Sequence, residues 1–187
     1  MLAAGGSRRL GQPKQLLDWG GRPLLERVVA AVHTWPVSPV LVVLGACAEE
    51  VLDRVDLGAA LVVVNPEWEE GIASSLRVGF DLLAREGAAD WAFVALGDQP
   101  RVPPDVPPAL LAAAEESSRD AIVPVYRYQR GNPVLVGRPL WVRMMGLQGD
   151  AGAAALLRAH PGWVLEVRFD HAAPADVDSP ADIRDLS

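Results

Sequence analysis

Short continuous apolar runs alternate along this chain with stretches in which apolar residues recur at helical spacing. Continuous apolar runs are typical of strands that are buried on both faces of a sheet. Three such runs predict buried strands at residues 40–44, 61–64 and 91–96. Helical spacing predicts helices near residues 23–32, 48–55, 71–83 and 109–117, the last after a proline-rich loop over residues 100–108. This alternation indicates a parallel, doubly wound α/β sheet.

The last third of the chain has a different pattern. Apolar runs at residues 121–126 and 132–136 flank a polar turn, which predicts a hairpin or an excursion beside the main sheet. Helices near residues 140–145 and 151–159 and a strand at residues 163–169 follow. Because no repeat or linker interrupts the pattern, residues 1–187 are expected to form a single domain.

The first apolar run is unusually short. Only residues 1–4 precede the first glycine, whereas strands usually have about five or six residues. The first strand of this architecture is central in the sheet, so we expect a truncated strand at its middle. A mis-assigned start codon or a trimmed chain is the preferred explanation.

The loop after this run combines glycines with positive charge. It contains Gly5, Gly6, Ser7 and Gly11, and the cations Arg8, Arg9 and Lys14. Glycines allow close approach of a ligand, and successive loop amides form a concavity that suits phosphate oxygens. The loop also follows a strand, at the usual ligand-binding edge of an open α/β sheet. It therefore predicts an anion-binding site.

The spacing of this loop excludes two common phosphate-binding motifs. A Walker A loop has a lysine directly after its second glycine, but here Gln12 follows Gly11. A dinucleotide fingerprint needs G-x-G-x-x-G, which Gly5-Gly6-Ser7 lacks. Lys14 is the only lysine among 17 Lys and Arg residues. Because lysine is a compact point charge, unlike arginine, its single use inside this loop favours a functional role over a chance surface position.

The pattern L-A-A-G-x-S-x-R-x-G-x-x-K over residues 2–14 closely resembles the signature of the nucleotidyltransferases that include molybdenum cofactor cytidylyltransferase. The resemblance implies that the first strand's end and the glycine loop wrap the triphosphate of an NTP. The residues concerned are Leu2, Ala3, Ala4, Gly5, Gly6 and Ser7. Arg9 and Lys14 would neutralise the phosphates and, together with Asp98, form the catalytic set.

Asp98 lies just past the predicted strand at residues 91–96, with Gly97 between them. If the strands are parallel, it lies on the same edge as the glycine loop, where a carboxylate can hold Mg²⁺. The alternative interpretation is that Asp98 is an aspartate of an ordinary turn before a proline and has no functional role. Leu-Gly-Asp-Gln-Pro resembles the family's L-G-D-x-P, whose aspartate binds the metal, and this favours the functional interpretation.

The segment from Asn65 to Ser75 has a third pattern, Asn-Pro-x-Trp-x-x-Gly-x-x-x-Ser. Gly71 frees the backbone, and serines at a helix start present hydroxyls and amides to a ligand. Simple helix capping is about as good an explanation for Ser74. The stretch resembles the family's pyrimidine- and ribose-contacting loop, which implies nucleotide contacts for Asn65, Gly71 and Ser75.

Two further motifs carry resemblances. Arg130-Gly131-Asn132-Pro133 resembles the family's R-G-H-P, with an asparagine that cannot titrate in place of the histidine, and implies that Gly131, Asn132 and Pro133 face the acceptor. Asp178, in Asp-x-Asp-Ser-Pro, resembles a D-x-D-T-P segment and is a candidate second metal ligand beside Asp98. Helix capping explains Asp178 equally well.

Composition narrows the possible partners. The formal net charge of −7 argues against binding nucleic acid or an anionic membrane through bulk electrostatics. No apolar run reaches membrane-spanning length and no signal-like segment opens the chain. Cys47 is the only cysteine, so a reducing cytoplasm is the expected location.

The resemblance implies a three-layer α/β/α, Rossmann-like nucleotidyltransferase fold of the nucleotide-diphospho-sugar transferase type, with a mostly parallel sheet. It implies Mg²⁺-dependent transfer of NMP to a phosphate-bearing acceptor, with release of pyrophosphate. Leu-Ala-Ala-Gly resembles the cytidylyl-type version of the loop, so the hypothesis is CTP as donor and a molybdopterin-type cofactor as acceptor.

Two other functions remain open. A family offshoot could use the same loop to hold NAD(P)H and act as a small-molecule reductase. Alternatively, the protein could be a non-catalytic accessory protein that delivers the cofactor to an apo-oxidoreductase, such as a molybdenum hydroxylase.

Overall fold

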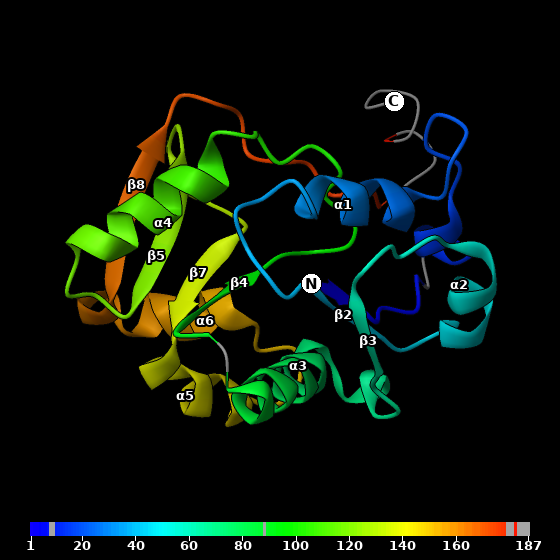
Figure 1. Ribbon diagram of the computed structural model, residues 1–187, viewed down its shortest axis with the longest axis horizontal. Helices are drawn as coiled ribbons and strands as arrows, with labels where there is room; N and C mark the ends of the chain where they lie inside the picture. The colour runs from blue at the N-terminus through cyan, green and yellow to red at the C-terminus, as the bar shows by residue number, and fades with distance from the viewer. Residues whose placement is uncertain (8–9, 88, 179–181, 183–187) are drawn as a thin grey trace.

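The computed structural model describes residues 1–7, 10–87, 89–178 and 182 (Figure 1). Its strands are β1 Leu2–Ala3, β2 Leu41–Leu44, β3 Leu61–Val64, β4 Trp91–Val94, β5 Ala121–Tyr126, β6 Gln129–Arg130, β7 Val134–Gly137 and β8 Val164–Phe169. Its α-helices are α1 Leu24–Val32, α2 Ala48–Arg54, α3 Ile72–Glu86, α4 Val106–Glu116, α5 Trp141–Met145 and α6 Ala153–Ala159. Short 3₁₀ helices are η1 Lys14–Leu16, η2 Trp68–Glu70, η3 Arg138–Leu140 and η4 Pro161–Trp163.

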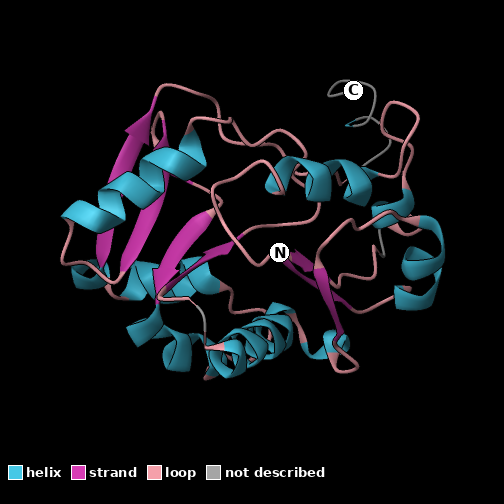
Figure 2. Ribbon diagram, in the orientation of Figure 1, coloured by secondary structure: helices cyan, strands magenta, loops and turns pink. Residues whose placement is uncertain are grey.

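The strands form a mostly parallel sheet between two layers of helices (Figure 2). β3, β2 and β1 are parallel neighbours, and a parallel bridge between Leu2 and Leu96 joins β1 to the segment just after β4. β7 pairs antiparallel with both β4 and β5, and β8 runs parallel to β5. This is the expected three-layer α/β/α nucleotidyltransferase fold.

The two layers of helices have separate cores. Buried residues of α1 and α2 pack with β2, and α4 packs with β5 and β7 on the same side of the sheet. On the opposite side α3 packs with α5, α6, β4 and β7. Figure 1 shows α1 above β2 and β4, α4 lying across β5 and β8, and α3 and α5 below the strands. Among the described residues, no helix is long and apolar enough to cross a bilayer.

The prediction of a buried strand at residues 61–64 is wrong in its burial. The strand forms at β3, but Leu61, Val62 and Val64 are 42%, 37% and 46% exposed. In the described part of the chain β3 pairs with β2 alone, so it is an edge strand. A four-residue apolar run does not reveal whether helices cover both of its faces, which is why the pattern misled.

Of the two alternatives predicted for residues 121–136, the antiparallel pairing expected of a hairpin is confirmed, because β5 pairs antiparallel with β7, and the position beside the main sheet is wrong. β5 and β7 are fully buried strands within the sheet, with β7 inserted antiparallel between β4 and β5. The short β6 lies between β5 and β7 in the chain and pairs antiparallel with the end of β5. Likewise, the proline-rich loop ends earlier than predicted, because α4 begins at Val106 and accepts prolines in its first turn.

We expect Leu25→Ala to lower the free energy of unfolding by about 2–5 kcal/mol, because this fully buried side chain packs between α1 and β2. The matched control is Leu61→Ala in β3, where a half-exposed leucine should cost at most about 1 kcal/mol. Denaturant titration of both variants measures the difference. Equal losses would contradict the edge position of β3.

Candidate functional site

The first strand and the fourth strand end at one cavity. Because β1 and β4 run in the same direction, their carboxyl ends meet at the same edge of the sheet. The cavity has a volume of about 390 Å³. It is lined by Leu2, Ala3, Ala4, Gly5, Lys14, Gln15, Trp68, Glu69, Gly71, Ile72, Ser75, Leu96, Gly97, Asp98 and Asp150. Most of the residues that sequence patterns assigned to nucleotide binding therefore lie around one space.

An ion pair between Lys14 and Asp98 lies at this cavity. The Lys14 ammonium donates a hydrogen bond to Oδ2 of Asp98, and Oδ1 of Asp178 lies 3.8 Å from the same nitrogen. The side chains of Lys14 and Asp98 are only 22% and 13% exposed. Partial burial strengthens a charged hydrogen bond relative to one in water, so these residues hold each other in place. Two carboxylates thus converge on one position for a cation.

Polar contacts close the loop between β1 and η1. The Ser7 hydroxyl accepts a hydrogen bond from the Lys14 amide at 2.9 Å. The side-chain amide of Gln15 donates hydrogen bonds to the backbone carbonyl oxygens of Ala3 at 2.8 Å and Gly5 at 3.0 Å. Gln15 is 2% exposed and was not among the predicted site residues. A polar residue directly after Lys14 and before two leucines was the available signal.

Trp68 forms one wall of the cavity and lies over the glycine loop. A Cβ atom on Gly6 would stand 2.8 Å from a ring carbon of Trp68, closer than such contacts allow. Glycine at this position therefore permits the indole to approach the loop backbone. Gly6 and Ser7 shape the loop, although they are not among the residues that line the cavity.

Asn65 lies behind the cavity wall. Its side chain is fully buried, and its amide group donates to the hydroxyls of Ser74 at 2.8 Å and Ser75 at 3.0 Å. Its side-chain oxygen, Oδ1, accepts a hydrogen bond from the backbone amide of Glu67 at 2.9 Å. Asn65 therefore orients Ser75, which lines the cavity.

Gly71 docks a distant loop against the start of α3. Its φ angle of 101° strongly favours glycine, and a Cβ atom there would lie 2.5 Å from the carbonyl carbon of Gly149. The Ala73 amide donates to the Gly149 carbonyl oxygen at 3.1 Å. These contacts bring Asp150 to the cavity, which no local pattern around residue 150 indicated.

Negative charge exceeds positive charge at the site. Among the described residues that line the cavity, Glu69, Asp98 and Asp150 are acidic and Lys14 is the only cation. Burial raises the pKa of the nearby Asp176, and the charges of Asp98 and Asp178 raise it further, against a hydrogen bond from Gln99 at 2.7 Å. The C-terminal segment is held there by the Val177 amide, which donates to the Asp98 carbonyl oxygen at 3.0 Å. Such an excess of carboxylates suits a divalent cation.

The residues present fit Mg²⁺. Oδ1 of Asp98 is buried and has no hydrogen-bond partner among the described residues, so it is available as a ligand. Asp178 supplies a second carboxylate near the same point. In the described part of the chain, no three His, Cys, Asp or Glu side chains are grouped to hold a metal by themselves. Mg²⁺ commonly binds through one or two carboxylates, with water and substrate phosphates as its other ligands.

Other predicted residues lie elsewhere. Arg9, assigned to the phosphates, is outside the described residues. Gly131 and Asn132 line a separate cavity of about 150 Å³ with Arg130 and Arg158, and Pro133 immediately precedes β7. The Tyr126 hydroxyl donates to the Asn132 carbonyl oxygen at 2.7 Å, and burial raises the pKa of Tyr126, so the donor stays protonated. The acceptor role of this loop stays a prediction.

Comparison with known proteins identifies the family. A family model described as a MobA-like NTP transferase domain matches residues 1–164. The chain is 33% identical to nicotine blue oxidoreductase of Paenarthrobacter nicotinovorans, over 96% of this chain and 90% of that protein. It is 22% identical to molybdenum cofactor cytidylyltransferase of Escherichia coli K12, over 97% of this chain and 91% of that protein.

Solved structures of similar proteins have the same fold as this chain. The crystal structure of Rv0371c from Mycobacterium tuberculosis H37Rv is 32% identical and covers 99% of this chain and 93% of its own, with a TM-score of 0.88. A manganese complex of the same protein aligns with a TM-score of 0.84 at 29% identity, over 99% of this chain and 94% of its own.

We expect Gly71→Ala to lower the free energy of unfolding by at least about 2 kcal/mol, because the added methyl group overlaps the Gly149 backbone. Gly149→Ala is the control: its φ is 60° and nothing lies within 4 Å, so only backbone strain of about 1 kcal/mol applies. Thermal denaturation compares the two variants. If Gly149→Ala costs as much as Gly71→Ala, the docking of the 149–150 loop is wrong.

Proposed function

This chain belongs to the MobA-like NTP transferase domain family, and from that premise we propose that it is a Mg²⁺-dependent cytidylyltransferase. The proposed reaction transfers CMP from CTP to a phosphate-bearing acceptor of the molybdopterin type and releases pyrophosphate. The observation that carries the proposal is the Lys14–Asp98 pair, which lies where the glycine loop and β4 meet at one cavity.

Phosphoryl transfer of this kind needs positioning and charge neutralisation more than side-chain chemistry. An acceptor phosphate oxygen attacks the α-phosphorus of CTP, and the bond from that phosphorus to the oxygen bridging to the β-phosphate breaks. The electron pair of that bond leaves with pyrophosphate. The attacking oxygen is already anionic, so no general base is required.

The residues of the chain divide this task. Lys14 turns from Asp98 to a phosphate oxygen and stabilises the charge that develops on the leaving pyrophosphate. The backbone amides of the loop from Gly5 to Ser7 hold the triphosphate. Trp68 and Ser75 lie beside the base and the ribose. When bound, Mg²⁺ supplies charge neutralisation on the phosphates, and Asp98 and Asp178 are the residues that would hold it. The manganese complex of a relative supports a divalent cation in this family.

The choice of CTP rests on the Leu-Ala-Ala-Gly loop and on likeness to a protein named molybdenum cofactor cytidylyltransferase. An apo-oxidoreductase that receives the finished cofactor is a proposed partner. Delivery to it is a second role that is compatible with turnover.

A second candidate function is reduction of a small molecule with NAD(P)H. It is favoured by the relative named nicotine blue oxidoreductase, which is 33% identical over nearly the whole chain. The two candidates differ in a simple measurement, because a nucleotidyltransferase neither oxidises NADPH nor requires it.

We expect pyrophosphate release with CTP in the presence of Mg²⁺ and acceptor, little release with GTP, ATP or UTP, and none after chelation by EDTA. A coupled pyrophosphate assay over the four nucleotides measures this. Preference for GTP would overturn the cytidylyl assignment. NADPH oxidation without pyrophosphate release would support the reductase instead.

We expect Lys14→Ala to lower kcat/KM for CTP by at least about 30-fold, which corresponds to about 2 kcal/mol of lost transition-state stabilisation. Arg54→Ala is the control, since it removes a cation from an exposed ion pair with Glu50 on α2 and should leave turnover unchanged. Steady-state kinetics of both variants tests the assignment. Undiminished turnover in Lys14→Ala would remove Lys14 from the mechanism.

A further inference from the structure

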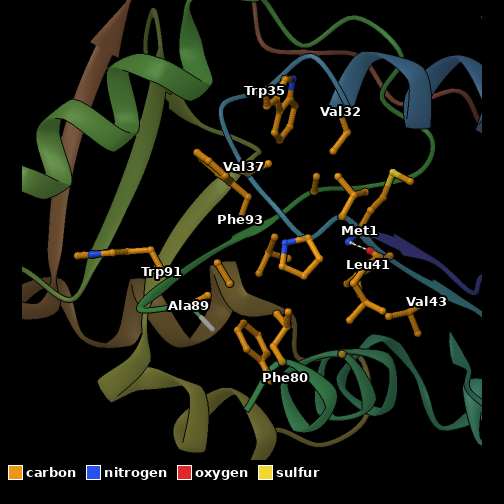
Figure 3. Close-up of a pocket in the computed structure, with 18 of the residues that line it drawn as sticks. Met1, Val32, Trp35, Val37, Leu41, Val43, Phe80, Ala89, Trp91 and Phe93 are labelled. Carbon is orange, nitrogen blue, oxygen red and sulfur yellow. Dashed lines mark hydrogen bonds between the residues drawn. The ribbon is translucent and has the colours of Figure 1, made fainter. Parts of the chain in front are cut away.

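Apolar side chains are exposed along the edge strand β3, whereas its neighbour β2 is covered. All four residues of β2 are buried, and Figure 3 shows Leu41 and Val43 among the apolar side chains around a cavity of about 100 Å³. In β3, by contrast, Leu61, Val62 and Val64 are 42%, 37% and 46% exposed. Edge strands are commonly protected from pairing with another chain by lysine, proline or a bulge. β3 contains neither residue and pairs with β2 in unbroken register, so its outer side is open to pairing.

The outward backbone groups of β3 have no strand partner in the described part of the chain. The amide of Leu61 donates to the carbonyl oxygen of Val40 at 2.8 Å, on the side of β2. Because successive residues of a strand direct their backbone groups to opposite sides, those of Val62 and Val64 face away from β2. Each of these two residues presents an N–H and a C=O group, which is the pattern that a further strand requires.

Acidic residues flank β3 on both sides. Residues 49–70 contain seven acidic residues and one arginine, so their net charge is −6, while that of the whole chain is −7. The acidic residues lie on α2, which packs on β2, in the turn before β3, and in and just before η2. Glu50 pairs with Arg54, and Glu70 pairs with Arg77. The acidic side chains of this segment that are exposed and have no ion pair among the described residues are Glu49, Asp53, Asp56 and Glu67.

We propose that β3 is a docking site for an extended segment of a partner protein, which adds to the sheet as a further strand and has apolar residues flanked by lysine or arginine. Hydrogen bonds to the backbone of Val62 and Val64, and contacts with the exposed apolar side chains of β3, hold the segment in place. The acidic residues around β3 select a basic segment and speed its association.

The charge of residues 49–70 also distinguishes this partner from other occupants. A second copy of this chain does not fit, because its own acidic segment would lie against this one and like charges across an interface repel. Nucleic acid and anionic membranes are repelled by the same residues.

Two labelled peptides test the proposal, Lys-Lys-Val-Thr-Val-Thr-Val-Lys and the same peptide with glutamate in place of each lysine. We expect the lysine peptide to bind in fluorescence anisotropy, and the glutamate peptide to bind at least about tenfold more weakly, because the acidic residues around β3 repel it. Added salt should weaken binding of the lysine peptide. Equal affinity for the two peptides, or no binding of the lysine peptide, overturns the proposal.

The variant Val62→Pro shows whether the peptide binds at β3. The amide of Val62 faces away from β2, so proline removes a donor from the outer edge without removing a hydrogen bond to β2. Val62→Thr is the matched control, because it keeps the amide and a strand-forming side chain. We expect Val62→Pro to weaken binding of the lysine peptide at least about tenfold and Val62→Thr to leave it unchanged. Equal binding by the two variants places the peptide elsewhere and contradicts the proposal.

A charge variant keeps the proposal testable even if proline disturbs folding. Glu67→Lys reverses an exposed charge just after β3 and leaves the strand itself unchanged. It should weaken binding of the lysine peptide and strengthen binding of the glutamate peptide. If neither affinity changes, the acidic residues do not select the partner.

Sedimentation of the protein alone tests the second copy as occupant. We expect the wild-type protein and Val62→Pro to sediment at the same rate at high concentration. A dimer that Val62→Pro dissociates would show that a copy of this chain covers β3, and would overturn the proposal.

Discussion

The central constraint of this structure is the meeting of one cation and one carboxylate at the edge where β1 and β4 end. Lys14 and Asp98 are 84 residues apart in the chain, and only parallel strands that share an edge bring them together. In the absence of ligand they neutralise each other, which makes it possible to keep both charges partly buried. The same two groups have the chemistry to separate, one towards phosphate and one towards a divalent cation.

Supporting contacts hold this pair in position from both ends of the chain. Gln15 ties the loop that carries Lys14 to the end of β1, and the amide of Val177 binds the C-terminal segment to the backbone of Asp98. Burial raises the pKa of Asp176, and the neighbouring carboxylates of Asp98 and Asp178 raise it further. The excess of carboxylates favours a bound cation, and in the proposed function a metal-bound triphosphate would supply it while binding the amides of the glycine loop.

Local sequence patterns predicted the fold class, most element positions and the Lys14–Asp98 meeting point. Glycine loops and strand-end carboxylates are encoded within a few neighbouring residues. The patterns failed where the answer depends on distant packing. Whether residues 61–64 are covered by helices, and whether β7 enters the sheet, depends on elements far along the chain. Gln15 and Asp150 were missed for the same reason, because their partners are set by the folded loop and by the docking of Gly149 on α3.

The most direct measurement is a crystal structure of the protein with a non-hydrolysable CTP analogue and Mn²⁺, with anomalous scattering used to locate the metal. The account predicts an anomalous peak beside the Asp98 carboxylate, with the Lys14 ammonium moved from Asp98 onto a phosphate oxygen. A nucleotide bound away from both residues, with the Lys14–Asp98 pair still intact, would contradict it.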